Sequence, residues 1–131
     1  MIHLDAGAIA ARLDRRALLD ALDAAFRKPH AVPPRMHCEV AAAQPGGRAG
    51  TLLVMPAWRV GGSLGIKVAT VFPDNALRGL PAVAATYLLL DAGTGQPRAA
   101  STARSATPAG QPRCTSVATA ASVARPMLPQ Q

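Results

Sequence analysis

The sequence predicts an α+β protein in which an N-terminal pair of helices packs on a mostly antiparallel sheet. Two observations lead to this fold class. The first thirty residues carry a helical pattern of apolar side chains, and about four apolar segments of strand length follow at short intervals. Because the connections between these segments are too short for crossover helices, we expect neighbouring strands to pair antiparallel. The 131 residues suffice for one domain with a modest core.

The N-terminal region predicts a short strand and two helices. Residues 2–4 are expected to form the strand. Asp5 precedes residues 6–13 and Asp14 precedes residues 15–28, each in the position of an N-cap, where a carboxylate accepts a hydrogen bond from a free helix N–H. Both segments are therefore predicted to be helices.

The second predicted helix is amphipathic. Leu18, Leu22 and Phe26 recur every four residues and so share one face. Pro29 ends the helix, since proline lacks the N–H that the helix would need. We expect the apolar face to pack on the sheet.

The strands are predicted from apolar, β-branched segments between glycine- and proline-rich turns. The expected strands are residues 35–42, 51–58, 63–72 and 83–91. Residues 44–50 and 91–95 contain the turn residues expected of hairpin loops.

The composition changes after residue 98, and we predict two regions, 1–98 and 99–131. In the second region, Ala, Ser, Thr and Pro supply 21 of 33 residues, and large apolar side chains are few. Such a segment buries too little apolar surface to offset the entropy lost on ordering. We therefore expect residues 99–131 to form a disordered tail.

Charge and cysteine usage exclude several classes of protein. The net charge is +7, but the arginines of the tail are scattered and no aromatic residue accompanies them, so nucleic-acid binding is not expected. Cys38 and Cys114 show no metal-binding spacing, and no metal site is expected. No segment has the length of a membrane span, and the N-terminus lacks the apolar core of a signal peptide. We expect a cytoplasmic protein that does not enter a membrane.

Lys67 is the most informative single residue. It stands in the middle of the apolar segment 63–72. An unpaired charge is costly to bury, so a lysine in such a strand needs a partner or a ligand. A lysine that extends its head to solvent from the sheet edge is the alternative reading.

Several short motifs occur in a consistent order along residues 1–98. Together they resemble the N-terminal part of the ornithine cyclodeaminase/mu-crystallin family. The motifs are Val-Pro-Pro-Arg (32–35), Thr-Leu-Leu-Val-Met-Pro-Ala-Trp (51–58), Leu-Gly-Ile-Lys-Val (64–68), Phe-Pro-Asp-Asn (72–75), Arg-Gly-Leu-Pro (78–81) and Tyr-Leu-Leu-Leu-Asp-Ala-Gly-Thr-Gly-Gln-Pro (87–97).

The resemblance implies roles for three residues. Arg35 would bind the carboxylate of the substrate, for which a planar guanidinium with two parallel donors is suited. Lys67 would contact the substrate and act as the catalytic proton donor or acceptor. Met55 would line the substrate pocket.

Two positions depart from the family's pattern. Members that cyclise ornithine carry a glutamate where this chain has Leu53, which favours a smaller or apolar amino or imino acid. Many members carry a cofactor-contacting threonine where this chain has Ala82. No cofactor-binding residue is therefore assigned in this chain.

The resemblance also implies a nicotinamide cofactor, NAD or NADP, bound by a Rossmann domain that follows in the family. No glycine-rich strand-to-helix turn appears in residues 99–131. We therefore expect a truncated or frameshifted N-terminal portion without a Rossmann domain, which binds no cofactor and is inactive alone. The full-length relative would interconvert amino and imino acids, as a ketimine reductase or amino acid dehydrogenase does, or cyclise ornithine to proline with release of ammonia. The alternative is a non-enzymatic dimerisation or binding module, for example a homodimer.

Overall fold

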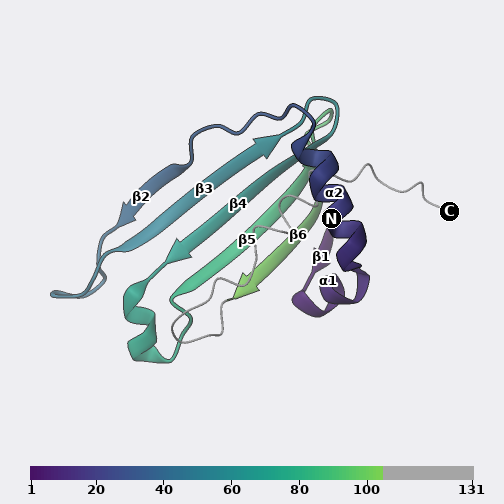
Figure 1. The fold of residues 1–131 in the computed structure, drawn as a ribbon. Helices are drawn as coiled ribbons and strands as arrows, with labels where there is room; N and C mark the ends of the chain where they lie inside the picture. Colours follow the sequence, from purple (N-terminus) through teal and green to yellow (C-terminus); the bar gives the residue numbers. More distant parts are fainter. Residues whose placement is uncertain (105–131) are drawn as a thin grey trace.

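The computed structural model describes residues 1–104, which form one six-stranded sheet with two helices beside it (Figure 1). The order of strands across the sheet is β1-β6-β5-β4-β3-β2. The elements are β1 (Ile2–Leu4), α1 (Ala6–Arg12), α2 (Arg15–Phe26), β2 (Met36–Val40), β3 (Gly50–Trp58), β4 (Ser63–Val71), the 3-10 helix η1 (Pro73–Arg78), β5 (Val83–Asp91) and β6 (Pro97–Arg104).

The sheet is antiparallel from β2 to β6, as predicted, because each of these strands pairs with its neighbour in the sequence. β1 is the exception and pairs parallel to β6. The four predicted strands agree with β2 to β5 to within two residues at each end. The α+β class with a mostly antiparallel sheet is confirmed.

Both helices begin where the sequence predicts. The Asp5 carboxylate accepts a hydrogen bond from the Ala8 N–H at 2.7 Å, and that of Asp14 accepts one from the Ala17 N–H at 2.8 Å. These two bonds satisfy N–H groups that have no partner within the helix.

The prediction that both helices pack on the sheet is wrong for α2. α1 lies against β1 and β6, whereas α2 makes no more than marginal contact with any described strand. The two helices lie at the side of the sheet that carries β1 (Figure 1). Leu18 and Leu22 are half-buried, but the Phe26 side chain at the end of the same stripe is 74% exposed. Amphipathic periodicity identified the apolar face of α2 but not what that face contacts.

The predicted boundary at residue 98 is also wrong, because Pro97–Arg104 form β6. β6 is a central strand, paired with β5 on one side and β1 on the other. Its small side chains gave no apolar pattern, but a central strand is held largely by backbone hydrogen bonds on both edges. The remaining part of the predicted disordered tail, residues 105–131, lies outside the described residues.

Few side chains in the described part of the chain are fully enclosed. The buried apolar side chains are Ala69, Tyr87 and Ala100, all in the three strands β4, β5 and β6. Most other apolar strand residues are half-buried. The sheet of residues 1–104 therefore carries much apolar surface that is only partly covered.

Polar contacts hold the end of the sheet at which β4 leads into η1 and β2 leads into β3. Asp74 in η1 accepts hydrogen bonds from the Arg48 backbone N–H and from its Nε, both at 2.7 Å, across the β2–β3 loop. These bonds hold the pKa of the Asp74 carboxyl below its ordinary value. The Asn75 side chain donates to the Pro81 carbonyl at 3.0 Å, which closes the turn into β5.

The revised position of β6 gives a direct test. Ala100→Pro removes a backbone donor from the middle of β6 and adds a ring at a buried position. We expect the free energy of unfolding to fall by roughly 3 kcal/mol or more. Urea denaturation followed by circular dichroism measures this. The control is Ala43→Pro, at an exposed loop position after β2, which should change it little. Equal effects of the two substitutions would contradict the assignment of residues 97–104 to the sheet.

Candidate functional site

The registers of the central strands place three side-chain positions in one row. Met55 in β3 pairs with Lys67 in β4, Lys67 pairs with Tyr87 in β5, and Tyr87 pairs with Ser101 in β6. Paired residues of adjacent strands project to the same side of a sheet. We call this side the Lys67 face, and the opposite side, which carries the neighbouring residue Ile66, the Ile66 face.

Arg35 lies next to this part of the sheet, at the start of β2. It directly precedes Met36, the first residue of β2, whose partner is Val54 in β3. Arg35 therefore lies beside β3 near Val54, two strand spacings, or about 10 Å, from the backbone of β4. The structure therefore brings the three site residues predicted from the sequence, Arg35, Met55 and Lys67, to one part of the sheet.

The segment that carries Arg35 is anchored on both sides. Ala31 forms an isolated bridge with Trp58, with the two N–H···O bonds at 2.9 and 3.0 Å. Pro33 and Pro34 then follow the edge of the sheet, where their lack of an N–H donor is tolerated. Arg35 itself is exposed. Its position is thus fixed by the backbone, and its side chain remains accessible to a ligand.

Small residues surround Lys67 on its own strand. Gly65 and Ala69, two positions before and after Lys67 on the same face, are both buried. Lys67 is half-buried, with Met55 and Tyr87 as its cross-strand neighbours. The lysine is therefore set in the middle of the sheet, not at its edge, and the alternative reading of a lysine at the sheet edge is wrong.

Tyr87 has no role assigned from the sequence. Its side chain is only 8% exposed, and its hydroxyl is buried without a hydrogen-bond partner among the described residues. Burial raises the pKa of Tyr87 to about 12. The ring lies over Gly65, since a Cβ at that position would come within 2.7 Å of the Tyr87 Cζ atom. In the sequence, this single tyrosine of the chain falls in an apolar strand and begins the motif 87–97.

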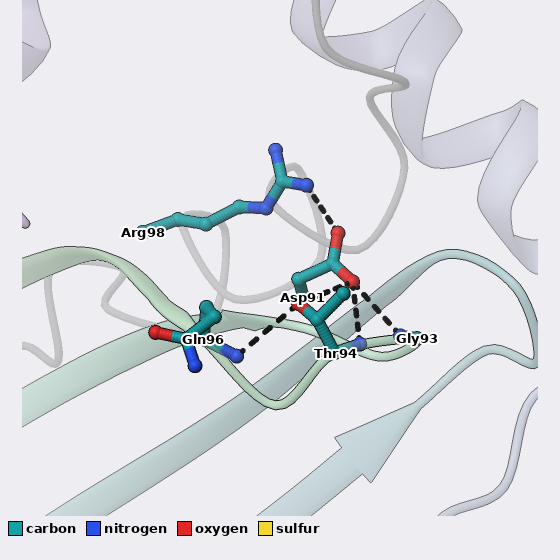
Figure 2. A network of polar contacts seen from close by, with 5 residues as sticks. All are labelled: Asp91, Gly93, Thr94, Gln96 and Arg98. Atoms are coloured by element: carbon teal, nitrogen blue, oxygen red, sulfur yellow. Dashed lines mark hydrogen bonds and ion pairs between the residues drawn. The ribbon is translucent and has the colours of Figure 1, made fainter.

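The turn between β5 and β6 is organised by Asp91 (Figure 2). Its Oδ1 accepts hydrogen bonds from the Gly93 and Thr94 N–H groups, each at 2.9 Å, and from the Thr94 hydroxyl at 3.1 Å. Its Oδ2 forms an ion pair with Arg98. The hydrogen bonds from Thr94 and the ion pair with Arg98 lower the pKa of Asp91 to about 2. The polar groups of this network form hydrogen bonds and an ion pair with one another, so the network stabilises the β5–β6 turn.

Residues 1–104 contain neither a glycine turn that opens a helix nor a cluster of metal-ligating side chains. Within residues 1–104, the glycines with positive φ are Gly46, Gly61, Gly79 and Gly95, and none of them opens a helix as a phosphate-binding turn does. No group of three His, Cys, Asp or Glu side chains in this part of the chain could hold a metal ion. Over the same residues, no helix has the length and apolar character needed to cross a membrane.

Comparison with known proteins identifies the family of the chain. A sequence model of the ornithine cyclodeaminase/mu-crystallin family matches residues 4–123, and the chain belongs to this family. An uncharacterized protein of Schizosaccharomyces pombe is 40% identical over 79 residues, which cover 60% of this chain and 24% of that protein.

Two solved structures share the fold at 26% identity and a TM-score of 0.62 each. One is the Δ1-pyrroline-2-carboxylate reductase of Thermococcus litoralis in complex with NADH and L-proline, where the match covers 78% of this chain and 32% of the reductase. The other is an archaeal alanine dehydrogenase dimer with bound NAD, with 79% and 31% covered. The chain thus spans about a third of the length of these enzymes.

The Asp91 network predicts a pH dependence of stability. Because folding lowers the pKa of Asp91 from about 3.8 to about 2, its stabilising effect is complete above the unfolded value and is lost as the pH falls towards 2. We expect Asp91→Asn to lower the urea midpoint at pH 7, and the deficit to shrink between pH 4 and 2. A deficit that stays constant over this range would contradict the ionic role of Asp91.

Proposed function

We propose that the described residues form the substrate-binding part of an NAD- or NADP-dependent enzyme that interconverts an amino acid and its imine. The observation that carries this proposal is the pairing of Met55 with Lys67, with Arg35 at the start of the neighbouring strand β2. A cation at each end of an apolar contact is an arrangement that suits a small molecule with a carboxylate and a nitrogen. Family membership and the two similar enzymes support the same substrate class.

In this proposal Arg35 binds the carboxylate through two parallel N–H donors. Met55 packs against the carbon skeleton between the two cations. Lys67 is the catalytic residue: its Nζ gives a proton to, or takes one from, the substrate nitrogen as that nitrogen changes between amine and imine. When bound, the nicotinamide supplies the hydride chemistry. We propose that residues outside 1–104 hold it, and that the described residues alone bind no cofactor and do not catalyse the reaction.

Leu53 narrows the class of substrate. It precedes Met55 by two positions on the Lys67 face and is paired with Ala69 in β4. These neighbours offer no carboxylate to a second amine on the substrate. We therefore propose that L-proline, L-alanine or their imines are preferred to L-ornithine, and that cyclisation of ornithine is the less supported activity. The protein would meet these substrates in the cytoplasm.

The second candidate function is a dimerisation module, and the Ile66 face favours it. Large apolar side chains from three strands share this face, and every one of them is only half-buried. They are Leu52, Val54, Trp58, Leu64, Ile66, Val68, Leu88 and Leu90. A continuous apolar surface of this kind is typical of an interface between subunits. We propose a homodimer through this face, which is compatible with substrate binding on the other.

Binding of L-proline tests the substrate proposal. We expect Arg35→Gln to weaken binding about 100-fold, since two charge-assisted hydrogen bonds are lost, and Arg35→Lys to weaken it about tenfold, because only the charge remains. Isothermal titration calorimetry on the full chain measures both. Arg16→Gln, at an exposed position in α2, is the control and should bind as the unchanged protein does. Unaltered binding by Arg35→Gln would contradict the role of Arg35.

Light scattering during size-exclusion chromatography tests the homodimer. We expect a discrete dimer for the unchanged chain and a monomer for Ile66→Lys, because a charge in the middle of the apolar face must be desolvated on association. Val60→Lys is the control, since Val60 is 91% exposed in the β3–β4 turn. If Ile66→Lys remains a dimer, the interface lies elsewhere on the molecule.

A further inference from the structure

Tyr87 is the one deeply buried polar side chain of the Lys67 face that the proposed mechanism does not use. The residue is 8% exposed, and its hydroxyl is closed to solvent without a hydrogen-bond partner among the described residues. Buried hydroxyl groups in native proteins almost always have a partner. A hydroxyl left without one in a sheet face next to a substrate site therefore requires an explanation.

The packing of the ring is specific. Tyr87 pairs with Lys67 across β4 and β5, yet its ring leans over Gly65, two residues before Lys67 on the same strand. A Cβ on residue 65 would come within 2.7 Å of Cζ and 3.1 Å of Cε2, so only glycine admits the ring in this position. The ring thus extends from β5 over β4, away from β6. It points towards the edge of the sheet formed by β2 and β3, where Arg35 and Met55 lie.

The hydroxyl is consequently close to the row that would hold the ligand. Gly65 and Lys67 are two residues apart on one strand, or about 6.7 Å. The hydroxyl therefore lies over the residue two positions before Lys67, on the same face of β4. The phenol is uncharged at neutral pH, as an ordinary tyrosine is, and burial raises its pKa further to about 12, so the group is available as an O–H donor.

We infer that the Tyr87 hydroxyl is a second substrate-binding group, which donates a hydrogen bond to a carboxylate oxygen of the bound amino or imino acid. The inference rests on the proposed function, since it assigns a further contact in the same site. Arg35 would hold the carboxylate from the β2 edge of the sheet, and Tyr87 would hold it from the β5 side. An acceptor supplied by the ligand would satisfy a buried donor that has no partner among residues 1–104.

Tyr87→Phe removes only the hydroxyl and is the decisive variant. We expect L-proline to bind the full chain about tenfold more weakly, as is typical for a lost hydrogen bond to a charged group. The thermal midpoint should stay the same or rise, because the hydroxyl makes no hydrogen bond with the described residues. Thr86→Val, which removes a hydroxyl from the opposite face of the same strand, is the control and should leave binding unchanged.

A second measurement separates a contact with the ligand from a purely structural role. L-prolinamide lacks the carboxylate, so the preference for L-proline over L-prolinamide should fall in Tyr87→Phe and stay constant in Thr86→Val. If Tyr87→Phe binds L-proline normally while Arg35→Gln does not, the inference is overturned and the proposed function stands. If the unchanged chain binds neither L-proline nor L-alanine, the proposed function fails and this inference fails with it.

Discussion

The pairing register of β3, β4 and β5 is the constraint on which the site depends. Side chains alternate between the two faces of a strand, so a shift by one residue would move Lys67 to the opposite face. The pairs Met55–Lys67 and Lys67–Tyr87 keep the lysine in line with the methionine and the tyrosine. No single side-chain interaction could position these groups as reliably, because the backbone ladder fixes all of them at once.

Polar turns at the two ends of the sheet support this register. At one end, Arg48 and Asp74 connect the β2–β3 loop to η1. At the other, Asp91 gathers the N–H groups of the β5–β6 turn and pairs with Arg98 (Figure 2). Loop geometry helps to set hairpin register, and these contacts hold the turns where few large side chains are enclosed. The chain thus relies on turn chemistry and backbone pairing where a larger domain would rely on its core.

Local signals in the sequence predicted most elements correctly. Asp5 and Asp14 cap the two helices, and the limits of β5 follow from the turn residues on either side of it. β6 was missed because its alanines and serines have no apolar period, and its place in the sheet is decided by pairing with distant strands. The packing of α2 was mispredicted for a related reason: a stripe such as Leu18, Leu22 and Phe26 shows which face is apolar but not its tertiary neighbour.

Three residues of the candidate site were assigned from the sequence and a fourth was not. Arg35, Met55 and Lys67 were chosen from short motifs, and the structure places them in one part of the sheet. Tyr87 was not chosen, since an aromatic residue in an apolar strand is ordinarily part of a core. The structure, in which β4 and β5 are paired, shows that its hydroxyl has no partner among the described residues and that its ring lies over Gly65. The pairing register of the strands cannot be predicted from a local pattern. It is this register that distinguishes Tyr87, as a candidate ligand contact, from an ordinary core tyrosine.

The most direct test of the account is to map L-proline binding on the sheet by nuclear magnetic resonance. The side-chain signals of Met55 and Tyr87 on the Lys67 face, and those of Val54, Ile66 and Leu88 on the Ile66 face, report on the two faces separately. The account predicts that L-proline shifts the signals of Met55 and Tyr87 and leaves the three signals of the Ile66 face in place. Shifts confined to the Ile66 face, or no shifts at saturating L-proline, would contradict it.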